Sequence, residues 1–145
     1  ITLFDSDTSP DPDGQGAKDC VNMALRKAGI DADKIDYINA HATSTPVGDQ
    51  IEYDAMLSIT PNRVMVSNKG QIGHMMATAG IAETIYSILG MRDSKVSGNV
   101  NLMNSCGSGM VLPVSALDHK IKYAIKNSFG FGGRNASMVL ENYEG

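Results

Sequence analysis

The stretch IDYINAHATSTP, residues 35–46, decides the fold of this chain. Its first four residues read as a short strand, and the polar residues after them predict a loop. The loop runs into a helix, with Thr45 as the predicted N-cap and Pro46 at the first helical position. We predict that this helix ends near residues 60–62. A strand that leads through a polar loop into a helix is typical of α/β domains.

The sequence on both sides extends this pattern. In chain order we predict a loop over residues 5–16, a helix over 17–28 ended by Gly29, a strand over 64–67, a loop over 68–73, an apolar helix from about His74 to Met91, β-like pieces near 96–100 and 111–114, and strands over 120–128 and 135–142. Strands and helices alternate first, and strands pair at the end. The pattern predicts a layered α/β fold in which a mixed sheet with helices ends in a β-hairpin.

Composition excludes several classes of protein. The 145 residues include 12 Lys and Arg against 16 Asp and Glu, and 42% are hydrophobic. This apolar fraction excludes general disorder, and the acidic balance argues against a nucleic-acid-binding surface. The longest apolar stretch, residues 77–91, contains Glu83 and is too short to span a bilayer. Because the chain begins with Ile1 and lacks the features of a signal peptide, we expect it to be cropped or processed there.

Cysteine spacing and glycine patterns narrow the chemistry further. Cys20 and Cys106 form no CxxC pair, which indicates reduced thiols in an intracellular compartment rather than a disulfide framework or a zinc site. The three histidines share no short ligand spacing, so a metal site is disfavoured. The glycine-rich turn at residues 130–133 matches no phosphate-binding loop.

Polar residues follow the predicted strands, where open α/β sheets place their ligand sites. They form three clusters: His41 with Thr43 and Thr45, Lys69 with His74, and the glycine-rich segment 129–133. A single histidine is most often a structural residue, but two neutral imidazoles that donate to one oxygen form an oxyanion or enolate hole. A position at a helix N-terminus would keep His74 neutral.

Glu83 is an acidic residue in an otherwise apolar helix. A buried carboxylate needs a partner, and Lys69 is the nearest basic candidate by placement. The alternative is that Glu83 faces solvent on an amphipathic helix.

Three motifs carry a family resemblance. They are NAHATSTP at residues 39–46, followed by Asp49 and Glu52; SNKGQIGH at 67–74; and NSFGFGGRN at 127–135. In this order they resemble the C-terminal half of a β-ketoacyl-acyl-carrier-protein synthase, an elongating type II condensing enzyme of the thiolase-like superfamily. The resemblance implies that residues 1–145 are a C-terminal thiolase-like domain, and that the N-terminal half with the nucleophilic cysteine is absent.

The resemblance also implies roles for individual residues. His41 and His74 would be two members of a Cys-His-His triad, and Lys69 would be the neighbouring catalytic lysine, paired with Glu83. Asp49 and Glu52 would support the site. Substrate would be contacted by Thr43 and Thr45 at the pantetheine arm and by Phe129 and Phe131 beside the acyl channel, with Phe131 as the gate.

The implied reaction joins an acyl chain, held as a thioester on the triad cysteine, to malonyl-acyl-carrier-protein with loss of carbon dioxide. The implied partners are the acyl carrier protein, which carries the phosphopantetheine, and the N-terminal half of the same enzyme; the complete protein would be a homodimer. No other cofactor, metal, nucleic acid or membrane is expected. The compartment would be the cytoplasm in a bacterium, and a plastid or mitochondrion in a eukaryote.

Departures from the family pattern leave alternatives open. Ala42 replaces a usual glycine, Arg134 a usual threonine, and MMATAG at residues 75–80 is bulkier than usual, which would narrow the pocket. Neither Cys20 nor Cys106 has the context of the nucleophile. One alternative is a non-catalytic partner that resembles a chain length factor. Another is a thiolase proper, which would place a cysteine near the C-terminal glycine-rich turn, where residues 127–135 contain none.

Overall fold

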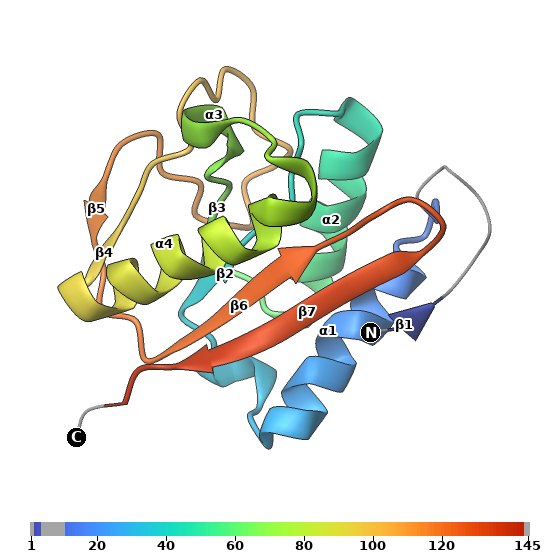
Figure 1. Cartoon of the computed structure of the whole chain (residues 1–145), viewed down its shortest axis with the longest axis horizontal. Helices are drawn as coiled ribbons and strands as arrows, with labels where there is room; N and C mark the ends of the chain where they lie inside the picture. Colours follow the sequence, from blue (N-terminus) through green and yellow to red (C-terminus); the bar gives the residue numbers. More distant parts are fainter. Residues whose placement is uncertain (1, 4–10, 144–145) are drawn as a thin grey trace.

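The computed structural model describes residues 2–3 and 11–143, which form a mixed sheet covered by helices (Figure 1). The sheet has five strands in the order β1–β7–β6–β2–β3. Their bounds are Thr2–Leu3 for β1, Tyr37–Asn39 for β2, Val64–Val66 for β3, Tyr123–Ser128 for β6 and Arg134–Glu141 for β7. Strands β6, β2 and β3 run parallel, whereas β7 is antiparallel to both β6 and β1. A separate antiparallel pair consists of β4, Lys95–Val96, and β5, Leu117–Asp118.

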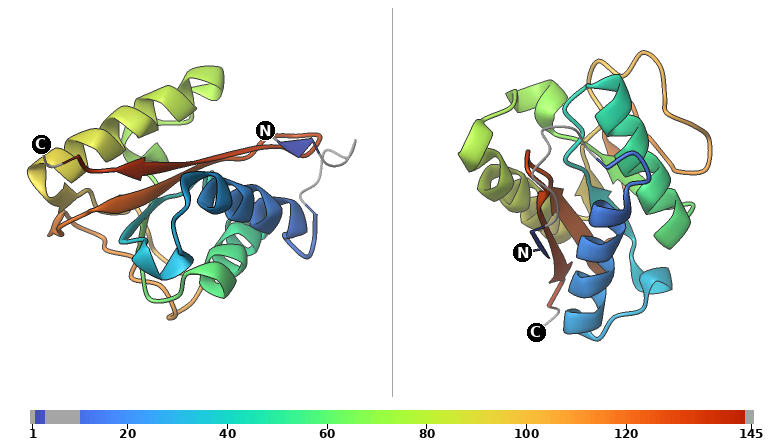
Figure 2. Two further views of the ribbon diagram at one scale, coloured as in Figure 1. Left: turned by 90° about the horizontal axis from the view of Figure 1, so that it is seen from below. Right: turned by 90° about the vertical axis from the view of Figure 1, so that its right-hand side faces the viewer.

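Helices lie on both faces of the sheet. Figure 2 shows α1, Gln15–Ala28, and α2, Pro46–Ile59, on one side, and α4, Ala79–Asp93, on the other. Shorter turns are η1 at Ala32–Lys34, α3 at Lys69–Ile72 and η2 at Met76–Thr78. The chain therefore folds as three layers, helix, sheet and helix, and the predicted α/β class with its terminal hairpin is confirmed.

Alternating side chains of the central strands fill two hydrophobic cores, one on each face of the sheet. Successive residues of a strand point to opposite faces. Ile38 and Ile125 accordingly belong to the core beneath α1 and α2, whereas their neighbours Tyr37 and Ala124 belong to the core beneath α4. All four are at most 3% exposed, so the central strands are buried on both faces.

The predicted helices over residues 17–28 and 46 to about 60 are confirmed as α1 and α2. Thr45 is the N-cap residue of α2 and Pro46 its first residue. The helix α1 begins at Gln15 rather than at Ala17, and residues 4–10 of the loop predicted before it lie outside the described residues.

The segment between β3 and α4 differs from the prediction. Residues 68–73 were expected to be a loop, but Lys69–Ile72 form the helical turn α3. The long helix was expected to begin at His74, but it begins at Ala79, after the 3-10 turn η2. Gly73, with a φ of 73°, ends α3 and redirects the chain, so His74 lies outside any helix. No helix dipole therefore acts on His74, and the prediction that a helix N-terminus keeps this ring neutral is wrong.

The predicted β-like pieces are much shorter than expected. Of residues 96–100 only Val96 lies in a strand, β4, and of residues 111–114 only Val111 pairs, in a single bridge to Val64. Backbone hydrogen bonds from Val111 to Arg63 and from Met65 to Val111 cover the outer edge of β3. The strand predicted to begin at residue 120 begins at Tyr123.

One face of α4 is left open in this chain. Its exposed apolar side chains, all between 40% and 64% exposed, are Ile81, Ile85, Tyr86, Ile88 and Leu89. Burial of apolar side chains is favourable, so a face of this kind marks a contact surface. None of the helices among the described residues combines the length and hydrophobicity that are needed to cross a membrane.

Candidate active site

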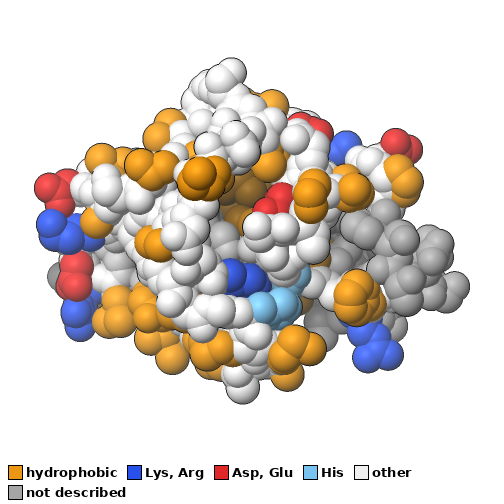
Figure 3. All heavy atoms as spheres, turned by 90° about the horizontal axis from the view of Figure 1, so that it is seen from above, with side chains coloured by type: hydrophobic (Ala, Val, Ile, Leu, Met, Phe, Trp, Pro, Cys, Tyr) orange, Lys and Arg blue, Asp and Glu red, His pale blue; other side chains and the backbone are white. Residues whose placement is uncertain are grey.

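The parallel strands bring the polar motifs together at one edge of the sheet. Strands β2, β3 and β6 share their direction, so the segments that follow them emerge side by side. His41, Lys69 and Phe129 lie in these three segments. Figure 3 looks onto this end of the molecule, where histidine and basic side chains lie beside a hollow with apolar and acidic side chains at its border.

The two predicted histidines are neighbours. The ring centroids of His41 and His74 are 5.6 Å apart at an interplanar angle of 83°, and Phe129 lies 6.1 Å from His41. The backbone N–H of Met76 donates to Nδ1 of His74 at 3.2 Å, so Nε2 of this ring is left to carry the proton. The arrangement leaves one imidazole N–H of His74 free to donate to a ligand.

His41 is held in its neutral form. Burial lowers its pKa to about 4, and the positive charges of Lys69 and Lys126 act in the same direction. At neutral pH the ring therefore has one N–H donor and one acceptor nitrogen. The neutral ring of His41 and the free N–H of His74, at this separation, fit the donor pair of an oxyanion or enolate hole.

Two carboxylates on α2 hold the loop that carries His41. Glu52 is 2% exposed and accepts the backbone N–H groups of His41 at 3.0 Å and Ala42 at 2.8 Å. Asp49 accepts the backbone N–H groups of Thr43 and Ser44 at 3.0 and 3.1 Å. Burial raises the pKa of both carboxyl groups, while these hydrogen bonds oppose the rise. Glu52 and Asp49 thus position the histidine loop rather than point into the site.

Glu83 is buried, which excludes the solvent-facing alternative. It is 0% exposed, and its Oε1 lies 2.5 Å from Nζ of Lys69, the partner expected from the sequence. Its second oxygen, Oε2, lies 2.8 Å from Nζ of Lys126, which the sequence reasoning missed. The sequence places Lys126 between Ile125 and Asn127 in a predicted strand, but its burial, and so its need for an acidic partner, follows only from the element packed on that strand.

A buried set of asparagines connects the ends of the strands, and sequence reasoning assigned it no role. Nδ2 of Asn39 donates to Oδ1 of Asn68 at 2.6 Å. Asn127 donates to Oε1 of Glu52 at 3.0 Å and accepts from Oγ of Ser137 at 2.8 Å. These bonds tie β2 to the segment after β3, and β6 to α2 and β7. The site is therefore built on buried polar contacts that join several elements, although Oδ1 of Asn39 accepts no hydrogen bond from the residues that the structure describes.

The expected substrate-contact residues lie at different depths. The hydroxyl oxygens of Thr43 and Thr45 are 3.3 Å apart near the start of α2. Phe129 is half-buried against His41, whereas Phe131 is 81% exposed at the tip of the hairpin. Gly132 and Gly133 have φ angles of 70° and 64°, which only glycine adopts readily in this turn. The structure thus groups Phe129 with the histidines and leaves Phe131 at the surface.

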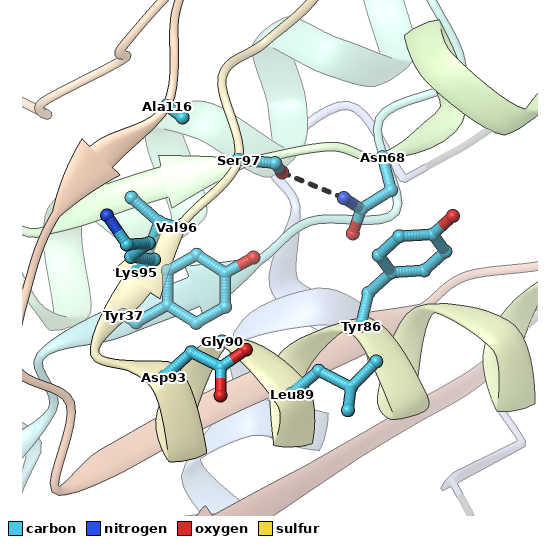
Figure 4. Close-up of a pocket in the computed structure, with 10 residues that line it drawn as sticks. All are labelled: Tyr37, Asn68, Tyr86, Leu89, Gly90, Asp93, Lys95, Val96, Ser97 and Ala116. Carbon is cyan, nitrogen blue, oxygen red and sulfur yellow. Dashed lines mark hydrogen bonds between the residues drawn. The ribbon is translucent and has the colours of Figure 1, made fainter.

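A cavity of about 250 Å³ lies beside this site, between α4 and the segment around β4 (Figure 4). Its lining contains no histidine and consists of Tyr37, Asn68, Tyr86, Leu89, Gly90, Asp93, Lys95, Val96, Ser97 and Ala116. Asn68 borders it and donates to Oγ of Ser97 at 2.9 Å. Burial raises the pKa of Tyr37 to about 12, so this phenol stays protonated.

Metal-ligand groupings and thiols add nothing to the site. Among the residues that the structure describes, no cluster of three or more His, Cys, Asp or Glu could hold a metal ion. His119 lies away from the other two histidines, where a ring nitrogen is 3.1 Å from the carbonyl oxygen of Asp36. Cys20 is buried in α1, and burial raises the pKa of the Cys106 thiol, the reverse of what activates a nucleophile.

A family model described as "Beta-ketoacyl synthase, C-terminal domain" matches residues 4–103, more than half of the chain. The chain belongs to this family. Its β-ketoacyl synthase relatives include 3-oxoacyl-[acyl-carrier-protein] synthase 2 of Rhizobium meliloti, which is 43% identical over 95% of this chain and 34% of the relative. The chloroplastic 3-oxoacyl-[acyl-carrier-protein] synthase II of Arabidopsis thaliana is 41% identical over 94% and 26% of the two chains. The chain therefore spans about a third or less of the length of these relatives.

Solved β-ketoacyl synthases have the same layered, thiolase-like fold. A ketosynthase in complex with its chain length factor from Xenorhabdus doucetiae superposes with a TM-score of 0.86 at 31% identity, over 97% of this chain and 36% of that one. A type II acyl-carrier protein in complex with its ketosynthase bound to the hexaketide gives 0.85 at 25% identity, over 99% and 36%. Each of these chains is also about three times as long as the matched region.

Proposed function

We propose that this chain supplies the two-histidine half of the active site of a condensing enzyme that elongates fatty acyl chains. The observation that carries the proposal is the pair of neighbouring imidazoles, His41 and His74, at the end of the parallel strands. The names of the relatives, 3-oxoacyl-acyl-carrier-protein synthases, support the same reaction.

In the proposed reaction, the bond between the carboxylate and the α-carbon of a malonyl thioester breaks and carbon dioxide leaves. The electron pair remains on the thioester as an enolate. The N–H groups of His41 and His74 stabilise the negative enolate oxygen, and the α-carbon then attacks the carbonyl carbon of the acyl thioester. The enzyme thiolate leaves, and a 3-oxoacyl thioester is the product. A pair of pre-organised donors is worth several kcal/mol to such a step.

The thiolate is proposed to come from the part of the protein outside this chain. Neither Cys20 nor Cys106 has the surroundings of a nucleophile, and the chain covers only about a third of its relatives. The open apolar face of α4 supports a contact between residues 1–145, as the C-terminal domain, and that remaining part. We further propose that the complete protein is a homodimer. Its compartment would be the cytoplasm in a bacterium and a plastid or mitochondrion in a eukaryote.

Acyl carrier protein is the proposed partner and carries the phosphopantetheine thioester; no separate cofactor enters the scheme. A solved neighbour contains an acyl-carrier protein bound to its ketosynthase, which supports a partner of this kind. Thr43 and Thr45, whose hydroxyls lie together in the His41 loop, would contact the pantetheine arm. Phe129 and Phe131 would line the acyl channel, with Phe131 as its gate.

The test is condensation by the complete protein. It is incubated with a fatty acyl thioester and malonyl-acyl-carrier-protein, and the 3-oxoacyl product is measured by mass spectrometry. We expect product from the parent and none from the variant in which both His41 and His74 are alanine. Equal product from the double variant contradicts the proposal.

A second candidate is a non-catalytic partner subunit that resembles a chain length factor. This candidate is supported by a similar solved structure, which is a complex of a ketosynthase with its chain length factor. Intact His41, His74 and Lys69 favour the enzyme. A complete protein that carries no nucleophilic cysteine, and that raises the output of a separate ketosynthase, would support the partner subunit instead.

A further inference from the structure

Lys126 is a buried cation to which neither the motifs nor the resemblance assigns a role. It lies in β6, two residues before the end of the strand, and is 2% exposed. Its Nζ is 2.8 Å from Oε2 of Glu83 and 3.1 Å from Oγ of Ser128, and it also donates to the carbonyl oxygen of Asn127. A charge at this depth is costly unless it is fully paired, so this position calls for an explanation.

We propose that Lys126 is a positioning residue of the histidine site. It binds Oε2 of Glu83, the oxygen that does not face Lys69, and it gives the cluster of Lys69, Glu83 and Lys126 an excess positive charge beside His41. The inference rests on the proposed function, because it concerns the same pair of histidines. Two ammonium groups face one carboxylate, and the side chains of all three residues are at most 6% exposed. Within the cluster of Lys69, Glu83 and Lys126, one lysine would neutralise Glu83, and the second leaves these three residues with a net positive charge.

The net positive charge of this cluster lowers the pKa of His41. The titratable groups that face His41 from the elements around it are Lys69 of α3, His74 before η2, Glu83 of α4, Lys126 of β6, and Glu52 and Asp49 of α2. Both lysines disfavour a second proton on the ring, and Glu83 favours it. Burial is the first cause of the lowered pKa of His41, and the two lysines, opposed in part by Glu83, lower it further. Together they keep the imidazole neutral and available as an N–H donor.

The test compares three lysine variants in the complete protein. Lys126→Met removes the charge and keeps most of the volume, and Lys126→Arg keeps the charge. Lys122→Met is the matched control, because Lys122 lies beside the start of the same strand, is 45% exposed in its side chain and pairs with Glu141. The titration of His41 is followed by NMR, and the pH dependence of kcat/KM for malonyl-thioester decarboxylation is measured beside it.

We expect Lys126→Met to raise the titration midpoint of His41 by about one pH unit, a usual effect of one nearby charge. The acid limb of kcat/KM moves in the same direction. Lys126→Arg and Lys122→Met stay at the parent values. Lys126→Gln, a second uncharged side chain that can still bond to Glu83, gives the same rise where the methionine variant does not fold.

The Glu83→Gln variant should shift the titration midpoint of His41 in the opposite direction. Removal of the carboxylate is expected to lower the midpoint of His41, which a general loosening of the site would not do. An unchanged midpoint in Lys126→Met or Lys126→Gln, or an equal change in Lys122→Met, overturns the inference. Because the NMR titration needs no turnover, a shifted midpoint in a protein that decarboxylates nothing supports the role of Lys126 and refutes only the proposed function.

Discussion

Replacement of Glu83 by glutamine is expected to destabilise the protein strongly. Glutamine has nearly the same volume, so no cavity forms, but the two ammonium groups at 2.5 and 2.8 Å lose the carboxylate that they share. Removing one partner of a buried ion pair costs about 3–5 kcal/mol of folding free energy. This is a large share of a typical domain stability of about 5–15 kcal/mol.

The assay is urea unfolding of the complete protein, parent against Glu83→Gln. The midpoint is expected to fall while the slope stays constant, because stability changes and the exposed surface does not. Lys95→Met is the matched control: it breaks a 2.6 Å pair with Asp118 whose two side chains are 63% and 84% exposed, and it should unfold like the parent.

The folding free energy that Glu83→Gln loses should also become smaller as the pH rises. Burial lowers the pKa of Lys126 below its ordinary 10.5, and Glu83 opposes that effect, so the variant lowers this pKa further. Between the folded pKa of Lys126 and 10.5 the unfolded chain binds more protons, so stability rises with pH. The deficit of Glu83→Gln is therefore larger at pH 7 than at pH 10, and it shrinks toward pH 10.5. A deficit that is absent, or equally large at pH 7 and pH 10, refutes the reasoning.

Three further predictions test other parts of the account. Phe131→Ala should change which acyl chain lengths the complete enzyme accepts, because the ring stands on a glycine turn and offers no polar group; an unchanged product profile argues against a gate. His41 should titrate by NMR near pH 4. Its contribution to the free energy of unfolding should be lost as the pH falls from 6.5 to 4, because the histidine of the unfolded chain is protonated first. A His41→Asn variant should lack this acid dependence. Replacement of Cys20 and Cys106 by serine should leave acyl-enzyme formation intact in mass spectra, and loss of acylation would identify one of them as the nucleophile.

Local patterns made most of the fold predictable. The helices α1 and α2 follow from apolar spacing with Gly29 and Pro46 at their ends, and the hairpin of β6 and β7 follows from two strands around a glycine turn. The start of α4 was missed because η2 and the positive φ of Gly73 interrupt a stretch that looks continuously apolar. Strand β1, two residues long, pairs with β7 across almost the whole chain and leaves no local signal.

The site was predictable where motifs carry it and not where long-range pairing does. His41, His74, Lys69 and Glu83 were identified from sequence, and the structure brings them together. Lys126 lies 43 positions after Glu83, and only the packing of α4 on β6 reveals the pair. Whether a charged residue in a strand is buried depends on the element packed against it, which spacing along one strand does not give.

Decarboxylation, measured as carbon dioxide release from malonyl-acyl-carrier-protein by the complete protein, most directly tests whether His41 and His74 stabilise an enolate. His74→Ala removes one enolate donor, and loss of such a donor slows a reaction roughly 100- to 1000-fold. Acyl transfer to the enzyme thiol, followed by mass spectrometry in the same samples, should stay close to the parent rate. Carbon dioxide release at the parent rate from His74→Ala would contradict the assignment of the two histidines as the enolate-stabilising pair.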